Sequence, residues 1–137
     1  MLSAERGNMV ADSDVIKEFD LSAEVNELES RKPWSKGLTS KTLLKSSDFR
    51  IVVVAMECGA KMQEHHSDGR ISIHVLDGAI RINVEQQAKI LQTGNLLTLE
   101  RSIKHDVEAV EDSVFLLTIA WPTNQELIDL KHRGYGS

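Results

Sequence analysis

Residues 59–78 read GAKMQEHHSDGRISIHVLDG, and the fold prediction depends on this stretch. Apolar residues stand at every second position of 71–75, and such strict alternation predicts a β-strand with one buried face. Asp77-Gly78 predicts a tight turn, and a second alternating run at 80–84 predicts the return strand. The stretch and its continuation therefore predict a β-hairpin.

Short runs rich in β-branched residues continue on both sides of this hairpin, separated by turn residues. About eight short strands at close spacing predict a sandwich or a barrel. The last run is apolar at nearly every position from 114 to 120, so we expect both of its faces to be covered, one of them by a second subunit. The further predicted strands are 42–45, 49–57, 61–65, 88–92, 95–99, 105–110 and 113–121.

The first residues of the chain differ from the rest in composition and periodicity. Residues 1–14 are polar or small and show no periodicity, which predicts a flexible lead, with Met9 as an alternative start. The length of 137 residues suits one domain. We therefore predict a single domain over 15–137, with a barrel core at roughly 38–122.

Two helices should flank the barrel. Apolar residues recur with helical spacing over 21–28 and predict a short amphipathic helix that ends before Pro33. Pro122 ends the sheet, and a Thr-x-x-Glu capping box at 123–126 predicts a short C-terminal helix that runs to about Arg133.

The composition excludes several classes of function. Hydrophobic residues make up 41% of the chain and charged residues 27%, as in ordinary globular proteins. The net charge of −5 argues against a nucleic-acid partner, and no apolar run is long enough to cross a membrane. The single cysteine, Cys58, agrees with a reducing compartment, so we expect a cytoplasmic protein.

Two motifs resemble those of the cupin superfamily, a group of small β-barrels. The first family motif, G-x5-H-x-H-x(3,4)-E-x6-G, is matched by Gly59, His65 and Gly78. The second, G-x5-P-x-G-x2-H-x3-N, is matched by Gly94 and His105. The resemblance covers roughly residues 50–121 and implies an all-β, cupin-type jelly-roll barrel (double-stranded β-helix) with a short helix at each end. It also suggests a bacterial origin.

The departures from the motifs concern metal ligands more than backbone shape. The second histidine of the first motif falls on Ser67, and its glutamate falls on Ile71. A typical three-histidine, one-glutamate cupin site needs four converging donors, so the metal prediction weakens while the fold prediction holds. The proline, glycine and asparagine of the second motif fall on Glu100, Ser102 and Ala109.

Strand parity predicts which side chains share the barrel interior, since alternate residues point to opposite faces. His74 then lies outside, at the surface or in a dimer interface. Parity and motif spacing together favour His65 over its neighbour His66 as the inward residue. The predicted ligand pocket consists of His65, His105, Gln63, Ser67, Ile71, Ile73, Val75 and Val107.

These residues leave alternative functions open. The first is a homodimeric barrel that binds an unknown small molecule through a pocket around His65 and His105 and has no assigned catalytic activity. The alternative is a metal-dependent oxygenase or isomerase acting on a small polar organic substrate. Its divalent ion (Fe, Mn, Ni, Zn or Cu) would be held by His65 and His105, with His66 or a carboxylate as third ligand. A structural or partner-binding module is a third reading. None of them calls for a nucleic acid or a membrane.

Overall fold

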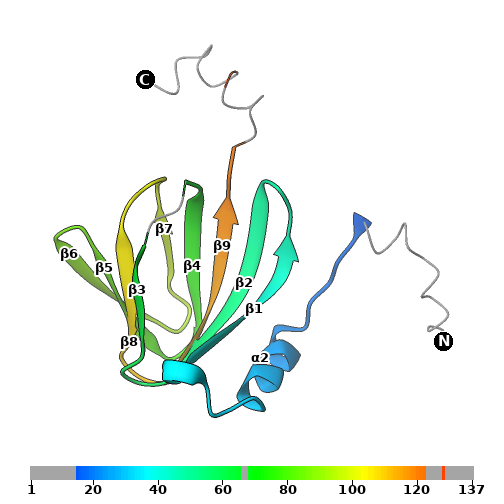
Figure 1. The fold of residues 1–137 in the computed structure, drawn as a ribbon, viewed down its shortest axis with the longest axis vertical. Coiled ribbons are helices and arrows are strands. Elements are labelled where there is room, and N and C mark those ends of the chain that lie inside the picture. Colours follow the sequence, from blue (N-terminus) through cyan, green and yellow to red (C-terminus); the bar gives the residue numbers. More distant parts are fainter. Residues whose placement is uncertain (1–14, 66–67, 123–127, 129–137) are drawn as a thin grey trace.

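The computed structural model describes residues 15–65, 68–122 and 128, and Figure 1 shows a β-barrel with one helix at its side. The described helices are α2 (Leu21–Glu29) and the short 3-10 helix η2 (Ser35–Gly37). The described strands are β1 (Leu38–Lys45), β2 (Phe49–Met56), β3 (Lys61–His65), β4 (Arg70–Asp77), β5 (Ala79–Val84), β6 (Gln87–Gln92), β7 (Leu96–Leu99), β8 (His105–Ala109) and β9 (Ser113–Ala120).

The strands form two antiparallel sheets. Sheet A has the order β1-β2-β9-β4-β7, and sheet B has the order β3-β8-β5-β6. Most neighbours in the sheets are far apart in the sequence; β2, for example, pairs with β9 along its whole length. This is the jelly-roll arrangement, so the prediction of an all-β barrel is confirmed.

The predicted hairpin between β4 and β5 is wrong, although both strands exist. β4 pairs with β7 and β9 in sheet A, whereas β5 pairs with β6 and β8 in sheet B. Gly78, with a φ of 95°, therefore turns the chain from one sheet into the other. Alternation and a turn signal predict two strands and a reversal, but they carry no information about which strands pair.

Alternate residues of both sheets meet in one apolar interior. The parity prediction for β4 is confirmed, since Ile71, Ile73 and Val75 are buried there while His74 lies on the other face. The buried members of this interior are Val54, Met56, Ile71, Ile73, Val75, Ile80, Ile82, Leu91, Val107, Ala109 and Phe115.

Helix α2 covers part of the outer face of sheet A. Asp20 caps the helix by accepting a hydrogen bond from the Ala23 backbone N–H at 3.2 Å. Leu28, fully buried, packs with Val53 and Val114 beneath it. The predicted N-terminal helix is therefore confirmed, and part of the cover over the apolar strand β9 comes from this same chain.

An ion pair ties α2 to the neighbouring edge of sheet A. Lys41 on β1 places its Nζ 2.6 Å from Oε1 of Glu24. The hydrogen bond to Glu24 is the main cause that raises the pKa of Lys41 above its ordinary value. Because both side chains remain partly exposed, the pair orients the helix more than it stabilises the fold.

Two predictions concern segments that the structure does not describe. The flexible lead at 1–14 lies outside the described residues, and so does the C-terminal helix at 123–133 apart from Ile128. Within the described part of the chain, neither helix is long and apolar enough to cross a membrane.

The crossover at Gly78 yields a stability prediction. A Cβ on Gly78 would lie 2.3 Å from the Asp112 carbonyl oxygen, at a backbone φ of 95°. The left-handed backbone alone costs an alanine about 1–2 kcal/mol, and overpacking adds about 1–3 kcal/mol. We expect Gly78→Ala to lower the free energy of unfolding by at least about 2 kcal/mol, measured by urea denaturation.

Gly94 supplies the matched control. Its φ is 89°, but a Cβ there would meet no atom within 4 Å. Gly94→Ala should therefore lose only the backbone part. Equal losses in the two variants would contradict the role of close packing at the crossover.

Candidate functional site

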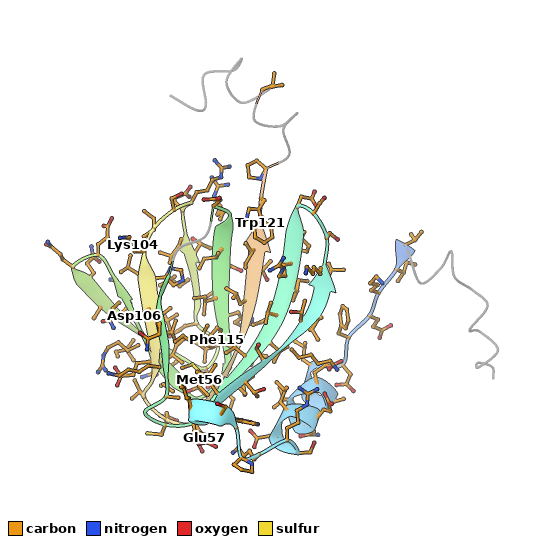
Figure 2. All side chains as sticks on the ribbon, viewed as in Figure 1. Met56, Glu57, Lys104, Asp106, Phe115 and Trp121 are labelled. Carbon is orange, nitrogen blue, oxygen red and sulfur yellow. The ribbon has the colours of Figure 1, made fainter. Side chains whose placement is uncertain are left out.

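One end of the barrel, here called the mouth, gathers the groups that can bind a ligand. It consists of residues 46–48, 68–69, 85–86, 100–104 and Trp121, which follow or precede the strand ends of both sheets. Figure 2 shows Trp121 and Lys104 at this end and places Met56 and Glu57 at the opposite end.

Apolar side chains near the mouth are only half-buried, although they pack on the interior. Deeper residues such as Val75 and Ile80 are completely buried. The interior is therefore closed in its middle and partly exposed toward the mouth, and Leu38 and Ala60 are half-buried at the opposite end. The half-buried inward set, here called the wall, consists of Val52, Val84, Leu97, Leu99, Leu117 and Ile119.

His105 is the buried polar residue of this region. It begins β8, is 4% exposed, and pairs in register with Val84 of the wall. Its Nδ1 lies 3.0 Å from the carbonyl oxygen of Ile103. A carbonyl oxygen only accepts, so Nδ1 donates the proton in this hydrogen bond. The backbone therefore fixes the orientation of the imidazole.

The two histidines of the sequence motifs occupy adjacent positions in sheet B. His65 ends β3, and its backbone pairs with that of His105. For His65, the structure describes the position of the backbone. His66 and Ser67 lie outside the described residues, so the preference for His65 over His66 stays a prediction.

The predicted apolar pocket residues are more completely buried than expected. Ile71 and Val107 are 4% and 2% exposed, and Ile73 and Val75 are 1% and 0% exposed. They share the interior that parity predicts, but packing covers them almost completely. Ile71 and Ile73 pair in register with the wall residues Leu99 and Leu97, and these half-buried neighbours carry the accessible surface.

Gln63 lies on the outside of sheet B, in contrast to the parity prediction. The register shifts between Met62 and His65, so β3 contains a bulge with one extra residue. Gln63 is exposed, and together with Asn83 and Asp106 it lines a polar depression on the outer face. The bulge interrupts the regular alternation of β3, so the parity argument that placed Gln63 inside does not hold.

Gly69 holds the end of β9 in place at the mouth. A Cβ at this buried glycine would come within 2.8 Å of the Ala120 carbonyl oxygen and within 3.1 Å of Trp121 Cδ1. The backbone of the segment that precedes β4 therefore lies directly against the end of β9. This close approach positions the Trp121 ring beside the mouth.

The described residues do not fit the four-donor metal site of the family motifs. Ile71, at the glutamate position, is buried among apolar side chains and offers no donor atom. Across residues 15–65, 68–122 and 128, no group of three or more His, Cys, Asp or Glu residues is placed to hold an ion. We therefore derive no chemistry from a metal.

Sequence reasoning missed the wall residues. The sequence does contain a signal for them, because an apolar residue follows two positions after Val52, Leu97 and Leu117 on their strands. On β9 this alternation is hidden, since nearly every residue of the strand is apolar and both faces appear buried.

Comparisons with solved structures agree with this architecture. An RmlC-like cupin from Desulfovibrio desulfuricans is 25% identical, with 77% of this chain and 96% of that one covered and a TM-score of 0.64. A conserved protein of unknown function from Streptococcus pyogenes is 26% identical, with coverage of 66% and 79% and a TM-score of 0.62. The Cnp3 cupin domain of Schizosaccharomyces pombe is 21% identical, with 80% of each chain covered and a TM-score of 0.62. No protein-family profile and no curated protein matches the chain.

Proposed function

Since the chain is a small cupin-domain protein by its fold, we propose that its barrel binds a small organic molecule in the cytoplasm without catalysing a reaction. One observation carries the proposal: a buried, backbone-oriented imidazole, His105, lies among apolar side chains that are half-buried at the mouth. Ligand sites commonly combine an apolar lining with a few fixed polar groups. His65, paired with His105 through the backbone, is the proposed second polar group.

The wall should define where such a molecule binds. We expect benzyl alcohol, a neutral probe with an apolar ring, to shift the amide signals of Val84, Leu99 and Ile119 in a ¹H–¹⁵N NMR titration of the full chain. Leu99→Trp fills the mouth and should weaken this binding at least about tenfold, equivalent to about 1.4 kcal/mol.

Thr98→Trp is the matched control, because the neighbouring Thr98 is exposed and pairs with Ser72 on the outer face. It should leave binding unchanged. Shifts confined to the outer faces of the sheets, or equal effects of the two variants, would contradict a site at the mouth.

The competing function, a metal-dependent oxygenase or isomerase, predicts a different metal content. Because Ile71 removes a donor from the motif, we expect far less than one ion per chain after incubation with Fe, Mn, Ni, Zn or Cu, as measured by elemental analysis. Near-stoichiometric metal that disappears in both His65→Ala and His105→Ala would overturn this expectation and favour the enzyme.

We further propose that the protein is a homodimer, and two apolar features support this. Leu96 is 62% exposed on the outer face of sheet A. It pairs with the half-buried His74, and His74 pairs in turn with Leu116, so the three residues form a continuous row, here called the Leu96 strip. Val15 and Ile16 are 80% and 72% exposed in the segment that leads to α2, and Figure 1 shows this segment running away from the barrel. In the proposed dimer, this segment of one copy covers the Leu96 strip of the other.

A charge placed on the strip should separate the two copies. We expect the mass measured by light scattering to fall from that of a dimer to that of a monomer in Leu96→Glu, since burying an unpaired carboxylate is costly. Ile90→Glu is the matched control on the outer face of sheet B, where Ile90 is 47% exposed. A wild-type monomer, or loss of the dimer in both variants, would contradict the arrangement.

A further inference from the structure

Two arginines have buried nitrogen atoms that lack a hydrogen-bond partner. Among the described residues, Nε of Arg50 and Nε of Arg101 are the buried side-chain nitrogen or oxygen atoms in this condition. A buried donor left unpaired costs roughly 1–3 kcal/mol, and more when it belongs to a charged group. Two such donors in one small barrel therefore call for an acceptor that the described residues do not supply.

Arg50 occupies an inward-facing register position at the mouth end of β2. It lies two residues before Val52 of the wall and pairs with Ile119, another wall residue, on β9. Its guanidinium carbon lies 5.2 Å from the centroid of the Trp121 ring. A guanidinium stacked on an aromatic face keeps its edge N–H groups available to an acceptor in the same plane.

Arg101 lies at the same end of the barrel, next to β7, the edge strand of sheet A that is separated from β2 by β9 and β4. It lies in the loop between β7, which ends at the wall residue Leu99, and β8, which begins at His105. Leu99 pairs with Ile71, and Ile71 pairs with Ile119, the partner of Arg50. Leu99, Ile71, Ile119 and Arg50 therefore form one row across sheet A next to the mouth. Arg50 stands at one end of this row, and Arg101 follows two residues after Leu99 at the other end.

Of the acidic residues of the mouth, which are Asp48, Asp68, Glu85 and Glu100, Glu100 forms an ion pair with a third arginine. Its Oε1 lies 2.9 Å from Nη2 of Arg70, and both side chains are largely exposed. The structure thus contains an ordinary surface ion pair next to two half-buried guanidinium groups whose inner nitrogens remain unpaired.

We infer that the mouth recognises a carboxylate group of the bound molecule through Arg50 and Arg101, while the apolar part of the molecule lies against the wall. This assignment rests on the proposed function and names its ligand class, an amphipathic carboxylic acid. Arginine presents parallel N–H donors that match the two oxygens of a carboxylate.

A carboxylate fits the surroundings better than a phosphate does. Arg50 stacks on Trp121, and the adjoining wall is apolar, so the site offers a flat donor edge beside an apolar surface. A planar group with one negative charge suits that edge, whereas a phosphate carries more charge and more acceptor oxygens around a tetrahedral centre.

Three probes that share a benzene ring separate these possibilities. Benzoate, benzyl alcohol and phenyl phosphate are each titrated into the full chain, and affinities are measured from ¹H–¹⁵N NMR shifts and from the indole N–H signal of Trp121. We expect benzoate to bind at least about tenfold more tightly than benzyl alcohol, as charge-assisted hydrogen bonds exceed neutral ones.

Variants identify the groups responsible. Arg50→Gln and Arg101→Gln should each reduce the preference for benzoate while binding of benzyl alcohol persists, and Arg50→Lys should restore only part of it because the fork is lost. Arg70→Gln is the matched control, since it removes a guanidinium from the same end of the barrel that is exposed and already paired. Arg101 lies in a loop, so its variant keeps the test decisive if Arg50→Gln unfolds.

The outcomes distinguish the two proposals. Equal affinities for benzoate and benzyl alcohol, or a preference that survives both glutamine variants, would overturn the carboxylate assignment and leave the binding function standing. Tighter binding of phenyl phosphate than of benzoate would also overturn the assignment. No binding by any probe would overturn the proposed function, and the assignment with it.

Discussion

The contact between the inner faces of the two sheets is the constraint on which the rest of the structure depends. Each sheet hides one apolar face only by packing on the other, because the outer faces are solvated or covered by a helix. Pairings between distant strands, such as β2 with β9, bring these faces together. The packing is complete around Val75 and Ile80 and becomes incomplete toward the mouth, so the same contact that forms the core also leaves the accessible wall.

Polar groups interrupt this apolar interior at one end, and they do so in different ways. His105 is buried and its Nδ1 is held by a backbone carbonyl, so the fold fixes the orientation of the imidazole. Arg50 and Arg101 retain unpaired buried nitrogens, a cost that folding alone does not explain. The proposed small-molecule site, with one oriented imidazole and a rim that binds a carboxylate, accounts for both observations.

The relation to the family motifs separates backbone requirements from chemical ones. The motif positions Gly59, Gly78 and Gly94 all have φ between 87° and 95°, and Ser102, at a glycine position of the motif, has a φ of 63°. The chain therefore keeps the turns of the motif even where the residue type differs. Ile71 shows the opposite case, in which the backbone position is kept and the donor is replaced by a core side chain.

The sequence by itself determined the strands, the N-terminal helix and the inward positions on β4 and β8, because period and local propensity act over a few residues. Sequence alone did not reveal three features. Gly78 joins two sheets instead of closing a hairpin, the bulge in β3 leaves Gln63 outside, and the wall residues remain half-buried beside the fully covered Ile71 and Ile73. Only the tertiary structure decided these features, since strand pairing, register and depth of burial depend on contacts between segments that are distant in the chain.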